Sequence, residues 1–142
     1  MHGDEPAFIA EKIADMRARR EREGLSPMIY GMAAYAIVRD TEAEALAEVE
    51  RITALDPEAA GFANFDQWLS GTQLEREMKI KEYSVSNRGL RPGLVGTAEQ
   101  VRARIEEFSA VGLDLLLLQM SPQLEEMERF AAQVIAPSAA VA

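Results

Sequence analysis

Apolar and polar positions along this chain repeat with two different periods, and the change of period separates helices from strands. Ile9, Ile13 and Met16 recur at spacings of four and three residues, which predicts a helix over residues 4–23. The run 28–38 is instead apolar at almost every position. Such a run is typical of a strand that is buried on both faces, as the strands of a parallel sheet are.

Two capping boxes predict where two further helices begin. Thr41 is followed three residues later by Glu44, and Thr97 by Gln100, so each pair can satisfy free N–H groups of a helix start. The apolar positions that follow recur at helical spacing. We expect the buried stripes to be Leu46, Val49, Ile52 and Leu55 in the first helix and Val101, Ile105 and Phe108 in the second.

A second apolar run, residues 113–120, contains four consecutive leucines and predicts another strand buried on both faces. Ser121 and Pro122 then predict a helix start, with Ser121 as its N-cap. We expect Pro137 to end this helix and residues 137–142 to form a frayed tail. The apolar face of the helix should comprise Leu124, Met127, Phe130, Ala131 and Val134.

Residues 57–93 interrupt this alternation. The stretch holds the only tryptophan of the chain and ends in a polar, turn-rich run over residues 84–93. It is far longer than the usual connection of about 2–6 residues between a strand and a helix. We therefore interpret it as an inserted loop or helical segment with a lid-like function.

Alternating buried strands and amphipathic helices predict a parallel α/β architecture. Two parallel strands cannot bury both of their own faces, because parallel sheets need neighbouring strands at their edges and helices on their faces. We therefore expect residues 1–136 to form part of a larger domain, and the isolated chain to be an incomplete catalyst.

The charge and residue composition exclude several classes of function. The chain has 24 acidic and 15 basic side chains, a net charge of −9, which argues against nucleic acid or anionic lipid as a partner. It has no cysteine, so disulfides, zinc–thiolate sites and a cysteine nucleophile are excluded. It shows no signal peptide, and no apolar run approaches the roughly 20 residues of a membrane span. We expect a cytoplasmic protein.

In a parallel barrel the chemistry takes place at the C-terminal ends of the strands. Tyr35 lies in the latter half of the first predicted strand, with Arg39 and Asp40 at its exit, and Gln119 and Ser121 lie at the exit of the second. We take these positions as candidates. The acidic pairs of the helices, such as Glu125-Glu126, we interpret instead as solvated faces.

Each candidate also has a plain structural alternative. Tyr35 could be a core residue, Ser121 an N-cap, and His2 an exposed residue near the chain start. Arg88 and Arg91, on a glycine-containing loop, could bring positive charge to a pocket and neutralise an anion, or could be solvated loop charges. The sequence has no phosphate-binding glycine loop, no HExxH metal motif and no nucleophile elbow, so we expect no metal site.

Several stretches of the chain together resemble the bacterial luciferase-like flavin monooxygenases. They are residues 2–17, 36–44, 93–101 and 112–119. The run 121–130 is similar to the dimethyl sulfone monooxygenase branch of that family. The resemblance covers nearly the whole chain but corresponds only to the C-terminal part of a family member.

The resemblance implies the C-terminal portion of a (β/α)8 TIM barrel with an inserted segment. It further implies reduced FMN (FMNH2) as cofactor, a separate NAD(P)H-dependent flavin reductase, O2, and a homo-oligomer in the full-length enzyme. In the dimethyl sulfone branch the implied reaction converts dimethyl sulfone to methanesulfinate. The catalytic residue itself stays unassigned, and we expect flavin affinity of this piece alone to be weak or absent.

The resemblance also implies a substrate and flavin pocket that includes His2, Tyr35, Arg88 or Arg91, Gln119 and Ser121. Ala33 and Tyr35 stand where alkanesulfonate relatives place an arginine and a histidine, and Ser121 stands where they have a tyrosine. These departures favour a small neutral sulfone over a sulfonate. A different hypothesis is a self-contained acidic α/β module that oligomerises through its 113–118 strand and has no catalytic activity.

Overall fold

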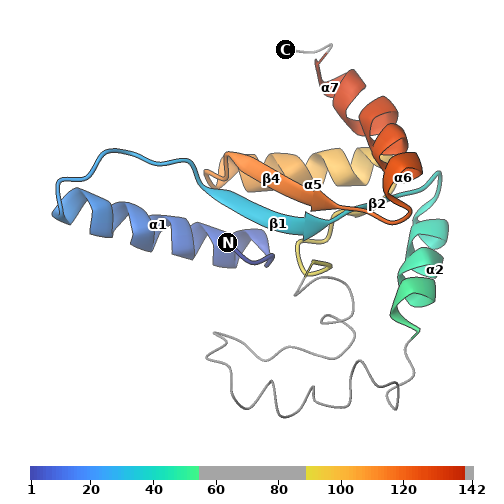
Figure 1. Cartoon of the computed structure of the whole chain (residues 1–142), viewed down its shortest axis with the longest axis horizontal. Coiled ribbons are helices and arrows are strands. Elements are labelled where there is room, and N and C mark those ends of the chain that lie inside the picture. The colour runs from blue at the N-terminus through green and yellow to red at the C-terminus, as the bar shows by residue number, and fades with distance from the viewer. Residues whose placement is uncertain (55–88, 140–142) are drawn as a thin grey trace.

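The computed structural model describes residues 1–54 and 89–139, and within them helices and strands alternate as the sequence predicts (Figure 1). Leu55, Arg88 and the inserted segment up to residue 88 lie outside the described residues. The last residues of that segment are described and include a turn at residues 89–92. The elements are α1 (Pro6–Arg22), β1 (Gly31–Tyr35), β2 (Ile37–Val38), α2 (Glu42–Thr53), β3 (Val95–Gly96), α5 (Ala98–Ala110), β4 (Leu115–Gln119), α6 (Gln123–Phe130), the π-helical turn η1 (Ala131–Ile135) and α7 (Ala136–Ala139).

Local sequence signals account for most of the helix ends. α1 begins at Pro6, and glycines with positive φ follow α1 and α5, Gly24 at 65° and Gly112 at 90°. Glycine adopts this conformation without the steric cost that a Cβ imposes, so it ends helices efficiently. Both predicted capping boxes are present, at the starts of α2 and α5.

The strands pair in parallel, as predicted. β1 pairs with β4 from Gly31↔Leu115 to Tyr35↔Gln119, and β2 pairs with β3. The single predicted strand over residues 28–38 thus divides at Ala36, whose N–H still donates to Gln119, while the N–H of Ile37 donates to Leu94 at 2.9 Å. The continuous strand β1–β2 therefore bonds β4 along one edge and β3 along the other.

The edge of β1 opposite β4 is also bonded to two other segments. The N–H of Ala33 donates to the carbonyl of Met1 at 3.1 Å, and the N–H of Tyr35 donates to the carbonyl of Gly89 at 2.7 Å. The first residue of the chain and the turn at 89–92 are thereby held beside β1. Among the described residues no strand pairs with the outer edge of β4.

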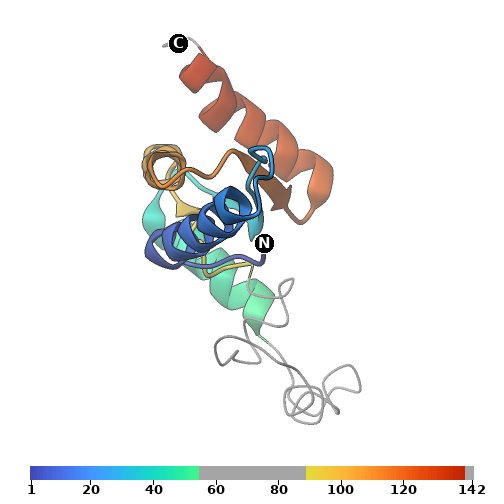
Figure 2. The same cartoon turned by 90° about the vertical axis from the view of Figure 1, so that its left-hand side faces the viewer.

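One face of the β1–β4 pair is covered by helices. Figures 1 and 2 show α1 and α5 running alongside the strands, while the α6–η1–α7 segment extends away from them. The even-numbered residues Met32 and Ala34 face these helices, together with the half-buried Leu116 and Leu118. They share one core cluster with Ile9 and Ile13 of α1, Val101 and Phe108 of α5, and Phe130 and Val134 near the C-terminus.

The prediction that residues 113–120 form a strand buried on both faces is wrong for one face. Leu115 is 58% exposed and Leu117 is 66% exposed. Their side chains point away from α1 and α5, because side chains alternate across a strand. No described element covers this second face along β4, so these two leucines remain open.

Three other predictions, about burial and about a helix end, are corrected by the structure. Leu46 is exposed, and its neighbour Ala45 is the α2 side chain that packs in the core. Leu124, Met127 and Ala131 are also exposed, and the buried positions of α6 are Glu126 and Phe130. Pro137 does not end the helix: it follows the π-helical turn η1 within one unbroken helical run, and α7 continues to Ala139.

None of the helices in the described part of the chain has the length and apolar character needed to cross a membrane.

Candidate functional site

The C-terminal ends of β1 and β4 bring three predicted site residues together. Tyr35 and Gln119 are paired across the two strands, and Ser121 follows β4 by two residues, close enough to Tyr35 for its hydroxyl to act on the pKa of the phenol. Tyr35 is buried, whereas Gln119 and Ser121 are exposed. The cluster thus joins one buried phenol to two accessible polar side chains.

Ser121 does not have the N-cap role that the sequence predicts. The N-cap of α6 is Pro122, and no side-chain hydrogen bond caps this helix. The hydroxyl of Ser121 instead lies near Tyr35, a residue far away in sequence, and acts to lower the pKa of its phenol. Sequence alone favoured the local partner, because serine before proline is a frequent helix start.

Burial raises the pKa of Tyr35 above its ordinary value, with further upward contributions from the negative charges of Glu48 and Glu126. The hydrogen bond with Ser121 and the positive charge of Arg51 act in the opposite direction. The net effect is upward, so the phenol is protonated at neutral pH and is able to donate a hydrogen bond. Tyr35 also packs in a small core cluster with Ile37 and Ala45, so the core alternative holds for its ring.

A group of ion pairs lies next to this cluster. Arg39 Nη1 lies 2.7 Å from Glu126 Oε2, and Arg39 Nη2 lies 3.7 Å from Glu48 Oε1. The side chains of Arg39, Glu48 and Glu126 are only 18%, 14% and 9% exposed. The pKa of Glu48 is lowered mainly by a hydrogen bond from Arg51, whose guanidinium lies 2.7 Å away, and also by the charge of Arg39.

Glu126 is the residue that the sequence interpretation missed. It was taken with Glu125 as part of a solvated face, but only Glu125 is exposed. A signal was available in the spacing: Glu126, Phe130 and Val134 recur every four residues, and the last two are buried apolar side chains. A carboxylate on the buried face of a helix requires a partner, and Arg39 supplies it.

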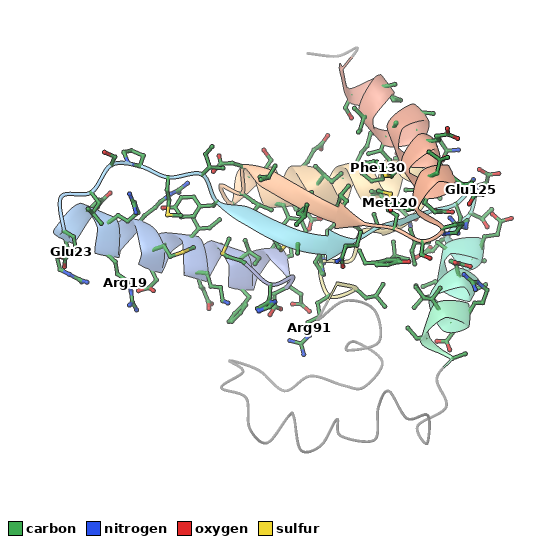
Figure 3. The ribbon with its side chains drawn as sticks, viewed as in Figure 1. Arg19, Glu23, Arg91, Met120, Glu125 and Phe130 are labelled. Atoms are coloured by element: carbon green, nitrogen blue, oxygen red, sulfur yellow. The ribbon has the colours of Figure 1, made fainter. Side chains whose placement is uncertain are left out.

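The other predicted site residues lie along the opposite edge of β1. Arg91 Nη1 lies 3.7 Å from the buried carboxylate of Asp4, and the turn that carries Arg91 is bonded to β1 through Gly89. His2 is exposed and adjoins Met1, which bonds β1 at Gly31 and Ala33. In Figure 3 Arg91 lies below the strands, whereas Met120 and Phe130 lie above them.

Two hollows in the described surface are lined by other residues. An apolar groove of about 280 Å³ opens between β4 and α6, lined by residues that include Leu118, Met120, Met127 and Phe130. A hollow of about 330 Å³ lies at the N-terminal end of β1, next to Tyr30. Neither contains Tyr35, Gln119 or Ser121. Among residues 1–54 and 89–139, no group of three histidine or carboxylate side chains is arranged to hold a metal ion.

Parallel strands joined by helices, with polar side chains gathered at the carboxyl ends of the strands, define the chain as a βα-type fold segment. The family model of the luciferase-like monooxygenases matches residues 1–115. The chain belongs to the luciferase-like monooxygenase family. Members of this family are monooxygenases that generally bind reduced flavin. The match includes Tyr35 and Arg39 and ends at the first residue of β4, so Gln119 and Ser121 lie beyond it.

Proposed function

We propose that this chain forms the C-terminal βα units of a (β/α)8 barrel in a flavin-dependent monooxygenase, and that it is inactive without the remaining units. The observation that carries the proposal is the combination of an uncovered apolar strand face with a polar cluster at its carboxyl end. In parallel barrels this is the end where the active site lies.

The uncovered face supports the barrel part of the proposal. Gly31 and Ala33 of β1 lie on it beside the exposed Leu115 and Leu117 of β4, because the paired residues of parallel strands share a face. Parallel strands are normally covered on both faces. Fully burying one leucine stabilises a protein by about 1.5–3 kcal/mol, so covering these two, each more than half exposed, would contribute about 2–4 kcal/mol. Further strands of a barrel would provide this cover.

The same face suits a reduced flavin, here proposed to be FMNH2. Its small and apolar side chains could accommodate a flat ring, and the hydroxyls of Tyr35 and Ser121 with the amide of Gln119 could bind the polar edge of the ring. When bound, reduced flavin supplies the electrons with which O2 is activated. The residues of this chain would bind and orient the flavin and the substrate, and the phenol of Tyr35 would hold a proton at its hydroxyl oxygen.

The proposed substrate is a small neutral organosulfur compound, dimethyl sulfone, which would be converted to methanesulfinate with release of formaldehyde. The arginines near the site support a neutral substrate, since Arg39 is paired with Glu126 and Glu48, and Arg91 with Asp4. Sulfone oxygens need only hydrogen-bond donors, such as the hydroxyl of Ser121 or the amide of Gln119. His2, Arg88 and Arg91 remain proposed members of the wider pocket.

The proposed partners follow from the same enzyme class. They are O2, a separate NAD(P)H-dependent flavin reductase and further copies of the enzyme in a homo-oligomer located in the cytoplasm. The net charge of −9 supports the view that neither nucleic acid nor an anionic membrane is a partner.

The decisive experiment mixes this chain with the preceding βα units of a luciferase-like monooxygenase. Size-exclusion chromatography and near-UV circular dichroism are recorded for each part and for the mixture, followed by titration with FMN. We expect a compact complex that binds FMN, and weak or no FMN binding by the chain alone. Leu117→Lys should abolish assembly, whereas Leu46→Lys, at an exposed leucine on α2, should not. FMN binding by the isolated chain at roughly micromolar or lower concentration would contradict the proposal.

The substrate is tested with the assembled protein, a flavin reductase, NADH and O2. We expect formaldehyde to be produced only when dimethyl sulfone is present, and Tyr35→Phe to reduce its rate. An assembly that binds FMN and releases no formaldehyde from dimethyl sulfone would keep the enzyme class and exclude this substrate.

A second candidate function is a self-contained acidic oligomerisation module. The open outer edge of β4 and its exposed leucines favour it, because exposed strand edges of this kind readily pair with another chain. The same chromatography distinguishes the two functions. A cooperatively folded dimer of the chain alone, indifferent to the added barrel units, would favour the module.

A further inference from the structure

Arg39 connects three elements at the end of the strand pair. It follows β2 directly, and its own N–H donates to the carbonyl of Gly96 at 3.0 Å, which ties it to β3. Its guanidinium donates to Glu126 of α6 at 2.7 Å and lies 3.7 Å from Glu48 of α2. With a side chain that is 18% exposed, Arg39 lies largely inside this junction.

The pair Arg39–Glu126 holds the start of α6 in place. Glu126 lies in the first turn of that helix, where its N–H donates to the carbonyl of Pro122. No side chain caps α6, so its start has no cap of its own to position it. Ser121 immediately precedes Pro122, and its placement therefore depends on where the first turn is anchored.

The same arginine also controls the electrostatics around the phenol. Glu48 and Glu126 both act on Tyr35 by raising its pKa. Arg39 contacts both carboxylates and balances part of their charge. Its removal would leave Glu48 paired with Arg51 and Glu126 paired only with Arg129 of its own helix, 3.9 Å away, and would release the first turn of α6.

We propose that Arg39 is a positioning residue of the candidate site, which through Glu126 holds Ser121 beside the hydroxyl of Tyr35. The inference rests on the proposed function only for the purpose that Ser121 and Tyr35 serve. Their placement needs neither flavin nor substrate, so it can be tested separately.

The experiment is a double-mutant cycle read at Tyr35. The chain carries three tyrosines, so all are labelled with ¹³C at Cζ and Tyr35 is assigned by its absence in Tyr35→Phe. The Cζ chemical shift responds to hydrogen bonding at the phenol oxygen and is recorded at pH 7. Spectra are compared for the unaltered protein, Ser121→Ala, Arg39→Gln and the double variant.

We expect Ser121→Ala to shift the Tyr35 signal in the unaltered background and to leave it unchanged in the Arg39→Gln background. The charge removed with Arg39 is common to both Arg39→Gln spectra and therefore cancels. Arg51→Gln is the matched control, since Arg51 also pairs with Glu48 but does not contact α6. In that background the effect of Ser121→Ala should be retained.

An equal effect of Ser121→Ala in both the unaltered and the Arg39→Gln backgrounds would overturn the proposal. If Arg39→Gln does not fold, Glu126→Gln replaces it in the cycle, because it breaks the same pair from the other side while nearly preserving side-chain shape. Failure of FMN binding or of sulfone oxidation would leave this result unaffected, so the two proposals fail separately.

Discussion

Replacing Glu126 with glutamine should destabilise the fold much more than the same change at its neighbour Glu125. Glu126→Gln keeps the size of the side chain and removes the charge that lies 2.7 Å from Arg39. Both glutamates lie in the first turn of α6, so both lose the same favourable interaction with the helix dipole. The difference between the two variants therefore isolates the buried ion pair.

The structure sets the expected magnitude. Removing one partner of a fully buried pair costs about 3–5 kcal/mol. Here Arg39 is 18% exposed and retains Glu48 at 3.7 Å, so part of its charge stays compensated. We therefore expect Glu126→Gln to lower the free energy of unfolding by about 2 kcal/mol. Glu125→Gln, whose side chain is exposed, should lower it by less than about 0.5–1 kcal/mol.

Urea unfolding followed by far-UV circular dichroism measures the difference. With a slope of about 1–3 kcal/mol per molar urea for a small protein, Glu126→Gln should lower the midpoint by about 1 M relative to Glu125→Gln. Adding Arg39→Gln to Glu126→Gln should cost less than Arg39→Gln alone, because contacting residues are coupled. Equal midpoints for the two glutamine variants would refute the assignment of Glu126 as a buried partner.

Three further predictions concern the rest of the fold. Phe108→Ala should lower the free energy of unfolding by about 3–5 kcal/mol, because the ring is almost completely buried between α5 and the strands; a loss below about 1 kcal/mol in urea unfolding would show that this core is not packed as described. Thr41→Ala should cost about 1 kcal/mol through loss of its capping box, with Thr41→Ser as the control that retains the cap. The pKa of Glu48 is lowered in the folded state, so its stabilising effect should be complete above its unfolded pKa of about 4.3 and should disappear as pH falls through the lower folded value. Arg51→Gln should therefore weaken the decline of the urea midpoint below about pH 4.3, and an unchanged pH dependence would contradict this.

Local signals in the sequence predicted much of the fold. The capping boxes at Thr41 and Thr97, the first helix within residues 4–23 and the parallel pairing of the two apolar runs are all present in the structure. The capping boxes and the helix depend on residues a few positions apart, so their physical cause is local. The parallel pairing was predicted from the apolar character of the two runs, because the strands of a parallel sheet are normally buried.

The candidate site was predicted only in part. The rule that chemistry lies at the carboxyl ends of parallel strands selected Tyr35, Gln119 and Ser121, and the tertiary structure brings these three together. The rule could not indicate that Ser121 lies beside Tyr35 and does not cap α6. That choice depends on the distance between two strand ends, which no local pattern encodes.

The sequence by itself determined where helices and strands form, how they alternate, and to which family the chain is similar. Only the tertiary structure decided which potential faces are covered: a helical or strand period marks side chains that could be buried, but not whether another element lies opposite them. Leu117 is open for this reason, although its run looks fully buried. Glu126 is buried for the converse reason, since Arg39, 87 residues earlier in the chain, folds against it and neutralises its charge.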